Sequence, residues 1–280
     1  MNIGISTLNP LYLRRQYHPI LVEKIFLYIQ HRIRAGHRKG RGIHPPFAYK
    51  FINGVIFGED IEGLDKIEIL RKSLLANREY ISVSDKGAGS KYSSRENRRI
   101  ADLVKHTAIN SGKGQLLARI VAGTGISRII ELGTGTGFSS SYMGMACPTT
   151  SILTCEGSPE IAALAEENIR KLGIENIEVH SDEFRSWLPV VLSHSPGELL
   201  VFLDGDHRGE RMQEYCDMII GSGNSKKIIV LDDIHWSTDM YRAWNKLIER
   251  DEISLSLQLY NTGIIFTGYR VQRDHFIINF

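Results

Sequence analysis

The spacing of apolar residues predicts that the first part of the chain is helical and irregular. Near the N-terminus apolar side chains recur at every fourth position, which places them on one face of an amphipathic helix that ends near Gly36. These positions are Leu21, Ile25, Ile29 and Ile33. One loop is expected over residues 44–47 and a second over residues 84–94, where glycines lie among polar residues.

A further helix is predicted to begin shortly before residue 100. Ser93 and Glu96 are three residues apart, which is the spacing of a capping box, and apolar residues follow on one side of the predicted helix. These are Ile100, Leu103 and Val104. We therefore treat residues 1–110 as a helical extension. Its aromatic residues Phe47, Tyr49, Phe51 and Phe57 lie close together in the sequence, which suggests a lid over a binding site or a surface for dimerisation.

After about residue 110 the pattern changes to short apolar runs that alternate with helical periodicity. We predict strands over residues 128–132, 151–155, 177–180, 199–203 and 227–231. The last two runs are largely apolar, as is typical of parallel strands that are buried on both faces. The helix before the third strand is marked by Ser158 as N-cap, Pro159 at its first position and Gly173 after its last turn.

The last two apolar runs, residues 254–260 and 263–269, leave no room for a helix between them, so they are predicted to pair as an antiparallel hairpin. The sequence thus predicts an α/β fold. Residues 111–280 would form a doubly wound, mostly parallel seven-stranded sheet with a C-terminal antiparallel hairpin, and residues 1–110 would form the helical N-terminal extension.

Composition excludes several classes of protein. The chain has 280 residues, of which 42% are hydrophobic and 24% charged, and this is enough apolar material for a substantial core. It has no run of 18 apolar residues that would predict a membrane-spanning helix, and its start lacks the layout of a secretory signal. The three cysteines form no CxxC pair. We therefore expect a cytoplasmic protein without a disulfide scaffold or a structural zinc site.

Positive charge is concentrated in one segment of the extension. Between Arg14 and Arg41 there are eight Lys and Arg residues against the single acid Glu23, a net charge of +7, whereas the whole chain carries +2. This segment is either a solvated helix face or a docking surface for nucleic acid, an anionic membrane or an acidic partner. Its densest part, from Arg32 to Arg41, contains no aromatic residue on which a base could stack, which favours the solvated face.

The sharpest chemical signal is a glycine-rich turn between the first predicted strand and the next helix. Residues 129–138 read IIELGTGTGF. The three glycines let the backbone approach a ligand closely, and the N–H groups at the start of the helix face that ligand. A dinucleotide-binding loop would read GxGxxG, with glycine in place of Phe138. This loop reads GxGxG and has an acid, Glu131, two residues before its first glycine.

An acid followed by GxGxG resembles the first motif of the class I S-adenosylmethionine-dependent methyltransferases, and the resemblance covers about residues 110–280. It implies that Glu156 accepts hydrogen bonds from the ribose hydroxyls. It also places Asp182 near the adenine amine, although Asp182 could equally cap the following turn. The residues implied to bind S-adenosylmethionine are Glu131, Gly133, Thr134, Gly135, Gly137, Glu156, Asp182 and Asp204.

Two acidic clusters follow the fourth and fifth predicted strands, over residues 204–207 and 232–236. The carboxyl ends of neighbouring parallel strands meet at one edge of a sheet, and oxygen-rich sites suit Mg²⁺ or Ca²⁺. This arrangement resembles the catechol and caffeoyl-CoA type O-methyltransferases. The resemblance implies a divalent cation, Mg²⁺ or another, bound by Asp204, Asp232 and Asp233.

The sequence departs from that family pattern at two positions. Asp233 stands where the family has Asn, and His207 lies near the place of a lysine that helps to deprotonate the substrate. A histidine can serve as a base near neutral pH. The predicted catalytic residues are therefore Asp204 and His207.

These clusters also allow a site without a metal. In that interpretation Asp204 and Asp206 orient the substrate while Asp232 caps a loop. His235 and Trp236 are expected to shape the substrate cavity rather than to perform chemistry, and Trp236 could simply close the core.

Three hypotheses about function follow from these patterns. The first is an enzyme that methylates a small molecule, at an oxygen atom. The second is an RNA or protein methyltransferase that docks through the basic segment, which would bind RNA with a steep dependence on salt. The third is a cofactor-binding module without catalysis. The segment His44–Phe47 is similar to the motif of amino-group methyltransferases, but it follows a basic, glycine-rich stretch rather than an apolar strand, so we interpret it as a turn.

Overall fold

The central sheet has five parallel strands in its middle and on one side. In the computed structural model, which describes residues 28–37, 42–83, 97–223 and 225–280, this sheet has eight strands in the order β10-β8-β9-β7-β6-β3-β4-β5. The parallel strands are β3 (Arg128–Leu132), β4 (Ser151–Glu156), β5 (Ile177–Ser181), β6 (Leu199–Leu203) and β7 (Lys227–Leu231). Every residue of β6 and β7 is buried, as the apolar runs predicted.

The C-terminal strands complete the sheet beyond β7. Strands β8 (Ile253–Leu259) and β9 (Thr262–Thr267) form the predicted antiparallel hairpin, and β9 pairs antiparallel with β7. An eighth strand, β10 (Asp274–Ile278), pairs parallel with β8 at the edge. The predicted fold class is confirmed, and β10 is an addition to the seven strands expected. It was missed because only two of its five residues are buried.

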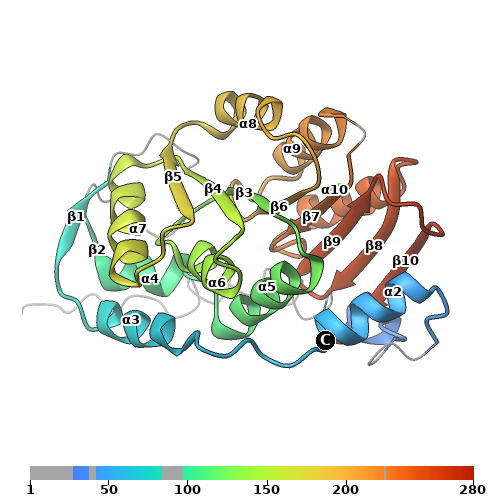
Figure 1. Ribbon diagram of the computed structural model, residues 1–280, viewed down its shortest axis with the longest axis horizontal. Coiled ribbons are helices and arrows are strands. Elements are labelled where there is room, and N and C mark those ends of the chain that lie inside the picture. Colours follow the sequence, from blue (N-terminus) through green and yellow to red (C-terminus); the bar gives the residue numbers. More distant parts are fainter. Residues whose placement is uncertain (1–27, 38–41, 84–96, 224) are drawn as a thin grey trace, which may run out of the picture.

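Six helices cover the two faces of this sheet (Figure 1). They are α5 (Ser111–Thr124), α6 (Phe138–Ala146), α7 (Pro159–Lys171), α8 (Phe184–Ser193), α9 (Gly209–Gly221) and α10 (Thr238–Ile248). Helix α7 begins as predicted, because the Ser158 hydroxyl accepts a hydrogen bond from the Ile161 N–H. Helix α5 continues past Gly123 to a left-handed Gly125. Gly123 instead allows close packing, since a Cβ there would lie 2.6 Å from a Val55 methyl carbon.

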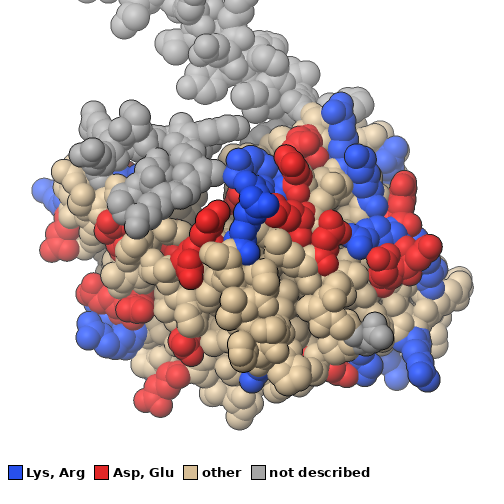
Figure 2. All heavy atoms as spheres, turned by 90° about the horizontal axis from the view of Figure 1, so that it is seen from above, with Lys and Arg blue, Asp and Glu red and all other residues tan. Residues whose placement is uncertain are grey.

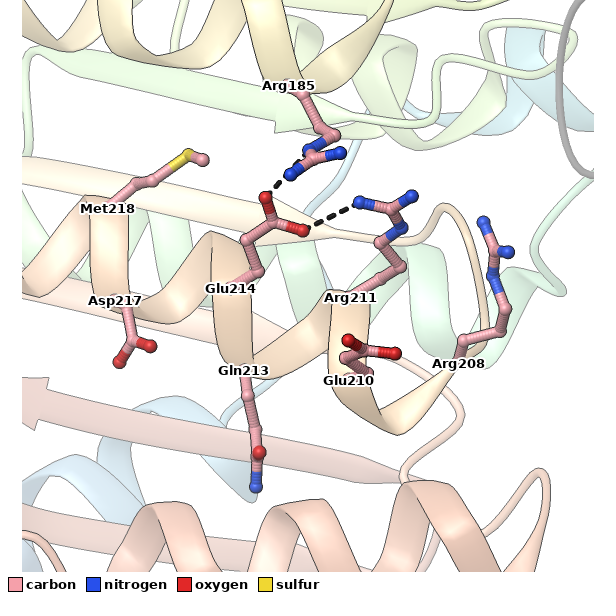
Figure 3. A pocket seen from close by; sticks show the side chains of 8 residues that line it. All are labelled: Arg185, Arg208, Glu210, Arg211, Gln213, Glu214, Asp217 and Met218. Atoms are coloured by element: carbon pink, nitrogen blue, oxygen red, sulfur yellow. Dashed lines mark hydrogen bonds and ion pairs between the residues drawn. The ribbon is translucent and has the colours of Figure 1, made fainter.

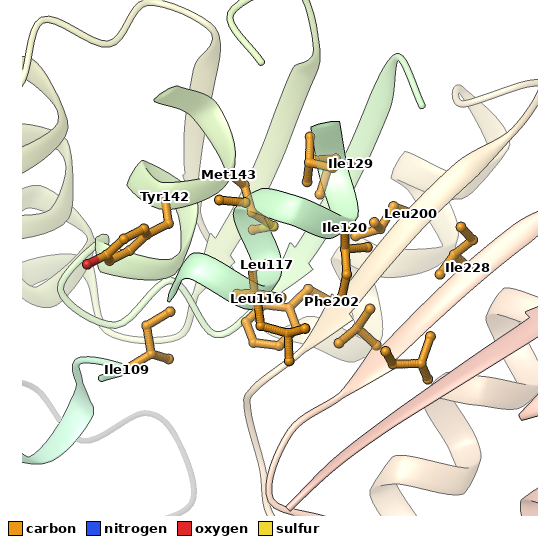
Figure 4. Packing of buried hydrophobic residues seen from close by; sticks show 14 of the residues in the cluster. Ile109, Leu116, Leu117, Ile120, Ile129, Tyr142, Met143, Leu200, Phe202 and Ile228 are labelled. Atoms are coloured by element: carbon orange, nitrogen blue, oxygen red, sulfur yellow. The ribbon is translucent and has the colours of Figure 1, made fainter. Parts of the chain in front are cut away.

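Alternate strand residues belong to two different hydrophobic clusters. On β6, Leu200 and Phe202 pack in the cluster that contains α5, while Val201 packs in the cluster that contains α8, α9 and α10. Figure 4 shows the first of these, in which Leu116, Leu117 and Ile120 of α5 lie against the sheet. The sheet is therefore buried on both faces, which leaves its strand ends as the place where polar side chains gather.

The described part of the extension packs into the same core. Its elements are α2 (Pro46–Phe51), the π-helical turn η2 (Ile52–Ile56), α3 (Asp65–Leu75), β1 (Tyr80–Ser82), β2 (Asn97–Arg99) and α4 (Ile100–Thr107). Ile52, Ile56 and Ile67 are fully buried in the cluster that contains α5. Phe51 packs edge-to-face on Phe266 of β9 at a centroid distance of 4.9 Å. The division at residue 110 and the role of the extension as lid or dimer surface stay predictions.

The local predictions for the extension have mixed outcomes. On α4 the predicted apolar face is confirmed, since Ile100, Leu103 and Val104 are buried. The loop expected over 44–47 is wrong at its end, because Pro46 already occupies the first position of α2, where its missing N–H costs nothing. The helix does not begin at the predicted capping box, because residues 97–99 form β2 and α4 starts at Ile100, with Arg99 in the N-cap position. Ser93, Glu96 and the loop over 84–94 lie outside the described residues.

The described turns of the first predicted helix bury a different face from the one expected. Residues 28–34 are helical, but Ile29 is 50% and Ile33 79% exposed, whereas His31 is only 4% exposed. His31 contacts the ring of Tyr260, in the turn between β8 and β9, at a centroid distance of 5.5 Å. An aromatic contact, rather than the apolar stripe, therefore decides which side of this helix faces the protein.

Candidate functional site

The glycine loop that joins β3 to α6 has the backbone conformation its sequence predicted. Gly133, Gly135 and Gly137 have φ values of 100°, 52° and 83°, which residues with a Cβ rarely adopt. A Cβ on Gly133 would lie 2.7 Å from the carbonyl oxygen of Asp204. The Asp204 N–H in turn donates to the Leu132 carbonyl at 2.9 Å. The loop therefore lies directly against the end of β6.

Glu156, at the end of β4, lies beside this loop. One carboxylate oxygen accepts a hydrogen bond from the Gly135 N–H at 3.0 Å, and the other accepts from the Ser158 N–H at 3.1 Å. Burial raises the pKa of Glu156, and these backbone donors oppose that shift. The side chain is thus fixed as an acceptor at the loop.

Glu131 lies beneath the loop and is fully buried. Its Oε2 accepts from the hydroxyls of Ser140 and Thr154, and Thr154 is also hydrogen-bonded to Thr134 of the loop at 2.6 Å. Its Oε1 is buried with no hydrogen-bond partner among the described residues. Burial raises the pKa of this carboxyl. Glu131 is therefore linked to the loop through Thr154 and Thr134, and its Oε1 has no hydrogen-bond donor among the described residues.

Asp182 accepts its hydrogen bonds at the turn that precedes α8. It is exposed, and one of its carboxylate oxygens accepts from the Glu183 N–H at 2.7 Å and from the Ser186 hydroxyl at 3.4 Å, at the start of α8. Its backbone N–H donates to the Glu156 carbonyl at 3.2 Å. Asp182 is thus a neighbour of Glu156 through its backbone, while its carboxylate is used at the start of the next helix.

The predicted metal ligands come to one edge of the sheet, and a lysine lies among them. Lys113, in the first turn of α5, donates to both oxygens of Asp232 at 2.6 and 2.8 Å and to Asp233 at 3.3 Å. Asp232 is buried after β7, and its N–H donates to the Leu203 carbonyl at the end of β6. Asp233 has a left-handed φ of 52°, and its N–H donates to the Asp232 carboxylate.

Electrostatics at this edge follow from burial and crowding. Burial, and then the nearby charges of Asp232 and Asp233, hold the pKa of Asp204 well above its usual range, while Lys113 opposes that shift. Burial also raises the pKa of Asp232 against the opposing effect of Lys113. Burial lowers the pKa of Lys113, but the charges of Asp232 and Asp233 outweigh it, so the net shift is upward. The ammonium form of Lys113 is therefore favoured.

These residues do not fit a divalent cation as they are arranged. Within the ranges described above, no three His, Cys, Asp or Glu side chains converge as a group that could hold a metal ion. The physical reason is the position of Lys113, whose ammonium already bonds to both oxygens of Asp232 and to one of Asp233. A divalent ion at the same oxygens would lie next to another positive charge.

Comparison with known proteins identifies the domain that carries this site. A family model described as a methyltransferase domain matches residues 130–234, from β3 to the loop after β7. Residues 130–234 are thus similar to a methyltransferase domain. The predicted resemblance to class I S-adenosylmethionine-dependent methyltransferases of the catechol and caffeoyl-CoA type is confirmed.

Named relatives agree with this domain. A catechol O-methyltransferase from Niastella koreensis is 29% identical over 129 residues, which cover 45% of this chain and 56% of the relative. The chain thus spans about half the length of the curated relatives it matches. An O-methyltransferase from Bacillus cereus, solved in complex with SAH, has a TM-score of 0.54 at 16% identity and covers 78% of this chain and 95% of its own. The O-methyltransferase TomG from Streptomyces achromogenes, in complex with SAM, has a TM-score of 0.51 at 20% identity and covers 59% and 82%.

Aromatic residues border the carboxylate edge of the sheet. The ring of His207 lies 5.2 Å from that of Trp236. His235 stacks between Tyr241 and Tyr260 at centroid distances of 4.5 and 5.0 Å, and burial lowers its pKa to about 4. His235 is therefore a neutral packing residue near pH 7, in keeping with its predicted non-chemical role.

Asp206 forms ion pairs with two arginines. It pairs with Arg208 and Arg211 at the start of α9, beside a hollow of about 630 Å³ (Figure 3). Within that hollow Glu214 accepts from Arg185 and from Arg211 at 2.7 Å each. Glu214 thus joins α8 to α9 across this hollow, and the candidate site lies at the strand ends.

The basic segment of the extension lies mostly outside the described residues. Of its described arginines, Arg32 donates to Asn279 and Arg34 to the Tyr241 hydroxyl. On the face drawn in Figure 2, Lys and Arg side chains lie among Asp and Glu rather than in one basic patch. Among the helices of the described residues there is none with the length and apolar character needed to cross a membrane.

Sequence reasoning missed two parts of this site. Lys113 reaches a carboxylate 119 positions further along the chain, and no local spacing signals such a contact. The hydroxyls of Ser140 and Thr154 that hold Glu131 were also missed. The sequence did contain one signal for them, because Glu131 lies between apolar residues of its strand and a buried carboxyl needs hydrogen-bond partners.

Proposed function

We propose that this protein transfers a methyl group from S-adenosylmethionine to a hydroxyl oxygen of a small molecule. The methyltransferase domain, the relatives named catechol O-methyltransferase and the fold shared with O-methyltransferases support this proposal. The observation that carries it is the position of Glu156, whose carboxylate is held at the glycine loop by the N–H groups of Gly135 and Ser158.

The residues around the loop fit S-adenosylmethionine. Glu156 is a half-buried hydrogen-bond acceptor, which suits a pair of ribose hydroxyls, and the glycines would let the backbone lie close to the nucleoside. The unsatisfied Oε1 of Glu131 is a further acceptor beneath the loop. When bound, S-adenosylmethionine supplies an electrophilic methyl group on a sulfonium.

The chain's own residues then have to orient an acceptor hydroxyl and take its proton. Asp204 is next to the glycine loop, because its carbonyl lies against Gly133, so we assign it the role of orienting the hydroxyl. A ring nitrogen of His207 takes the proton, and the Trp236 ring beside His207 gives the acceptor an apolar wall. Aromatic hydroxyl compounds are therefore the first acceptors to test.

Calorimetric titration of the full chain with S-adenosylmethionine tests the cofactor part of this proposal. The wild type should bind, and Glu156→Gln should bind about tenfold more weakly or worse, because a charged acceptor is lost. Glu167→Gln is the matched control, since Glu167 is an exposed carboxylate on α7 that forms a salt bridge with Lys171. Absence of binding by the wild type, or equal binding by Glu156→Gln, would contradict the proposal.

Transfer of a labelled methyl group to a panel of catechols, phenols and aliphatic alcohols tests the reaction. Turnover with a hydroxyl compound, and its loss in His207→Phe with cofactor binding unchanged, is the expected result. Binding without turnover on any acceptor would instead favour the non-catalytic module considered from the sequence.

A further inference from the structure

The carboxylate edge of the domain contains its own cation. We propose that the ammonium of Lys113 is the resident cation of the cluster that Asp232 and Asp233 form next to Asp204, and that this cluster therefore holds no divalent metal ion. The cluster belongs to the same site as the proposed methyl transfer, and its role in the reaction rests on that proposed function. Its decisive measurement, however, is cation binding, which does not depend on turnover.

The hydrogen-bonding capacity of the ammonium is used up at this cluster. An ammonium has three N–H donors. Lys113 Nζ has three carboxylate oxygens within reach, two on Asp232 at 2.6 and 2.8 Å and one on Asp233 at 3.3 Å. A metal ion bound by the same two residues would need those oxygens, so the two cations are alternatives at one place.

The lysine is held in position by its helix. Lys113 is in the first turn of α5, where its own N–H donates to the N-cap side chain of Asn110 at 2.9 Å. Its side chain is 26% exposed, so the ammonium is largely removed from solvent. The position of Lys113 therefore follows from the start of a helix whose apolar face is buried in the core.

The partner carboxylate is equally fixed. Asp232 is 5% exposed, its N–H donates to the Leu203 carbonyl at 2.9 Å, and Thr262 donates to one of its oxygens at 3.5 Å. A buried carboxylate needs a positive partner, because removal of that partner leaves an uncompensated charge. In this chain the ammonium of Lys113 supplies the positive charge beside Asp232.

A single ammonium and a divalent ion would differ in what they do for the proposed reaction. A divalent ion can bind a hydroxyl directly and lower its pKa. Lys113 instead offsets part of the negative charge of the cluster and donates hydrogen bonds to its carboxylates, which makes it a positioning residue. The proton of the acceptor then has to be taken by another side chain of the site. The proposed methyl transfer should therefore continue in the presence of EDTA.

Manganese binding followed by electron paramagnetic resonance tests the inference on the full chain after removal of metal ions. The wild type should leave the signal of free Mn²⁺ unchanged, with no site of dissociation constant below about 1 mM. Lys113→Met removes the ammonium, and should create a site that binds Mn²⁺ at least about tenfold more tightly than the wild type. Lys246→Met, which removes an exposed lysine on α10, is the matched control and should behave as the wild type.

Two further variants show whether a gained Mn²⁺ site lies at Asp232 and depends on the loss of the positive charge at position 113. Lys113→Met combined with Asp232→Asn should lose the gained site, and Lys113→Arg should keep a cation in place and gain none. Mn²⁺ binding by the wild type that Asp232→Asn abolishes would overturn the inference, and so would a folded Lys113→Met that gains no site. If Lys113→Met does not fold, Mn²⁺ binding by the wild type and by Lys113→Arg still tests the inference. Failure to bind S-adenosylmethionine would count against the proposed function alone.

Discussion

Gly133 and Asp204 meet backbone to backbone, because a Cβ on Gly133 would lie 2.7 Å from the Asp204 carbonyl oxygen. This contact joins the glycine loop after β3 to the acidic loop after β6. It therefore fixes the distance between the residues proposed to hold the cofactor and those proposed to orient the acceptor. Its effect on the site can be tested without altering any polar side chain.

Gly133→Ala should destabilise the protein and weaken S-adenosylmethionine binding. The substitution places a Cβ at a φ of 100° and against a backbone carbonyl, so we expect a loss of about 2–4 kcal/mol in the free energy of unfolding measured with urea. Gly125→Ala separates the two causes, since Gly125 has a φ of 65° with nothing within 4 Å of the added carbon. It should cost only about 1 kcal/mol. Equal losses in the two variants would show that the contact with Asp204 is unimportant.

The sequence predicted this loop and the parallel strands because their signals are local. Strands β6 and β7 are short apolar runs that have to be buried on both faces, and three closely spaced glycines allow few structures other than a tight turn. The start of α7 was predictable for the same reason, since Ser158 caps the helix with its own side chain.

Features that depend on distant contacts were not predictable. The contact of Lys113 with Asp232 joins α5 to the loop after β7, and only the assembled sheet brings them together. The buried face of residues 28–34 is set by Tyr260 and His235, which lie far along the chain, so the apolar spacing of Ile29 and Ile33 was misleading.

The pair of Lys113 and Asp232 should contribute measurably to stability. We expect Lys113→Met to lower the free energy of unfolding by about 1–3 kcal/mol, less than for a fully buried pair because Lys113 is 26% exposed. A double-mutant cycle with Asp232→Asn should give a coupling energy of about 1 kcal/mol or more, measured by urea denaturation in EDTA. Strictly additive effects of the two substitutions would mean that the contact contributes nothing.

Glu131 should make the protein less stable as pH rises. Burial raises its pKa above the ordinary value of 4.5, so the unfolded chain releases this proton at lower pH than the folded one. The stability that the protonated form provides is complete below pH 4.5 and is lost as pH rises through the folded pKa. Glu131→Gln cannot ionise, so its advantage over the wild type should grow from pH 4.5 to 8 in urea denaturation. Glu167→Gln, at an exposed site, should show no such trend.

His235 should have the opposite effect, on the acid side of neutrality. Burial lowers its pKa from 6.5 to about 4. The unfolded chain therefore binds a proton at this histidine below pH 6.5, whereas the folded chain binds it only near pH 4. Its contribution to stability is therefore complete above pH 6.5 and is lost as pH falls through that window, by about 1–2 kcal/mol at pH 5. His235→Phe keeps a ring between Tyr241 and Tyr260 and should remove this loss, so that its unfolding free energy changes less than that of the wild type between pH 7.5 and pH 5. His44→Phe, at an exposed histidine, serves as the control and should follow the wild type. A wild-type pH dependence that persists unchanged in His235→Phe would assign the loss to other groups.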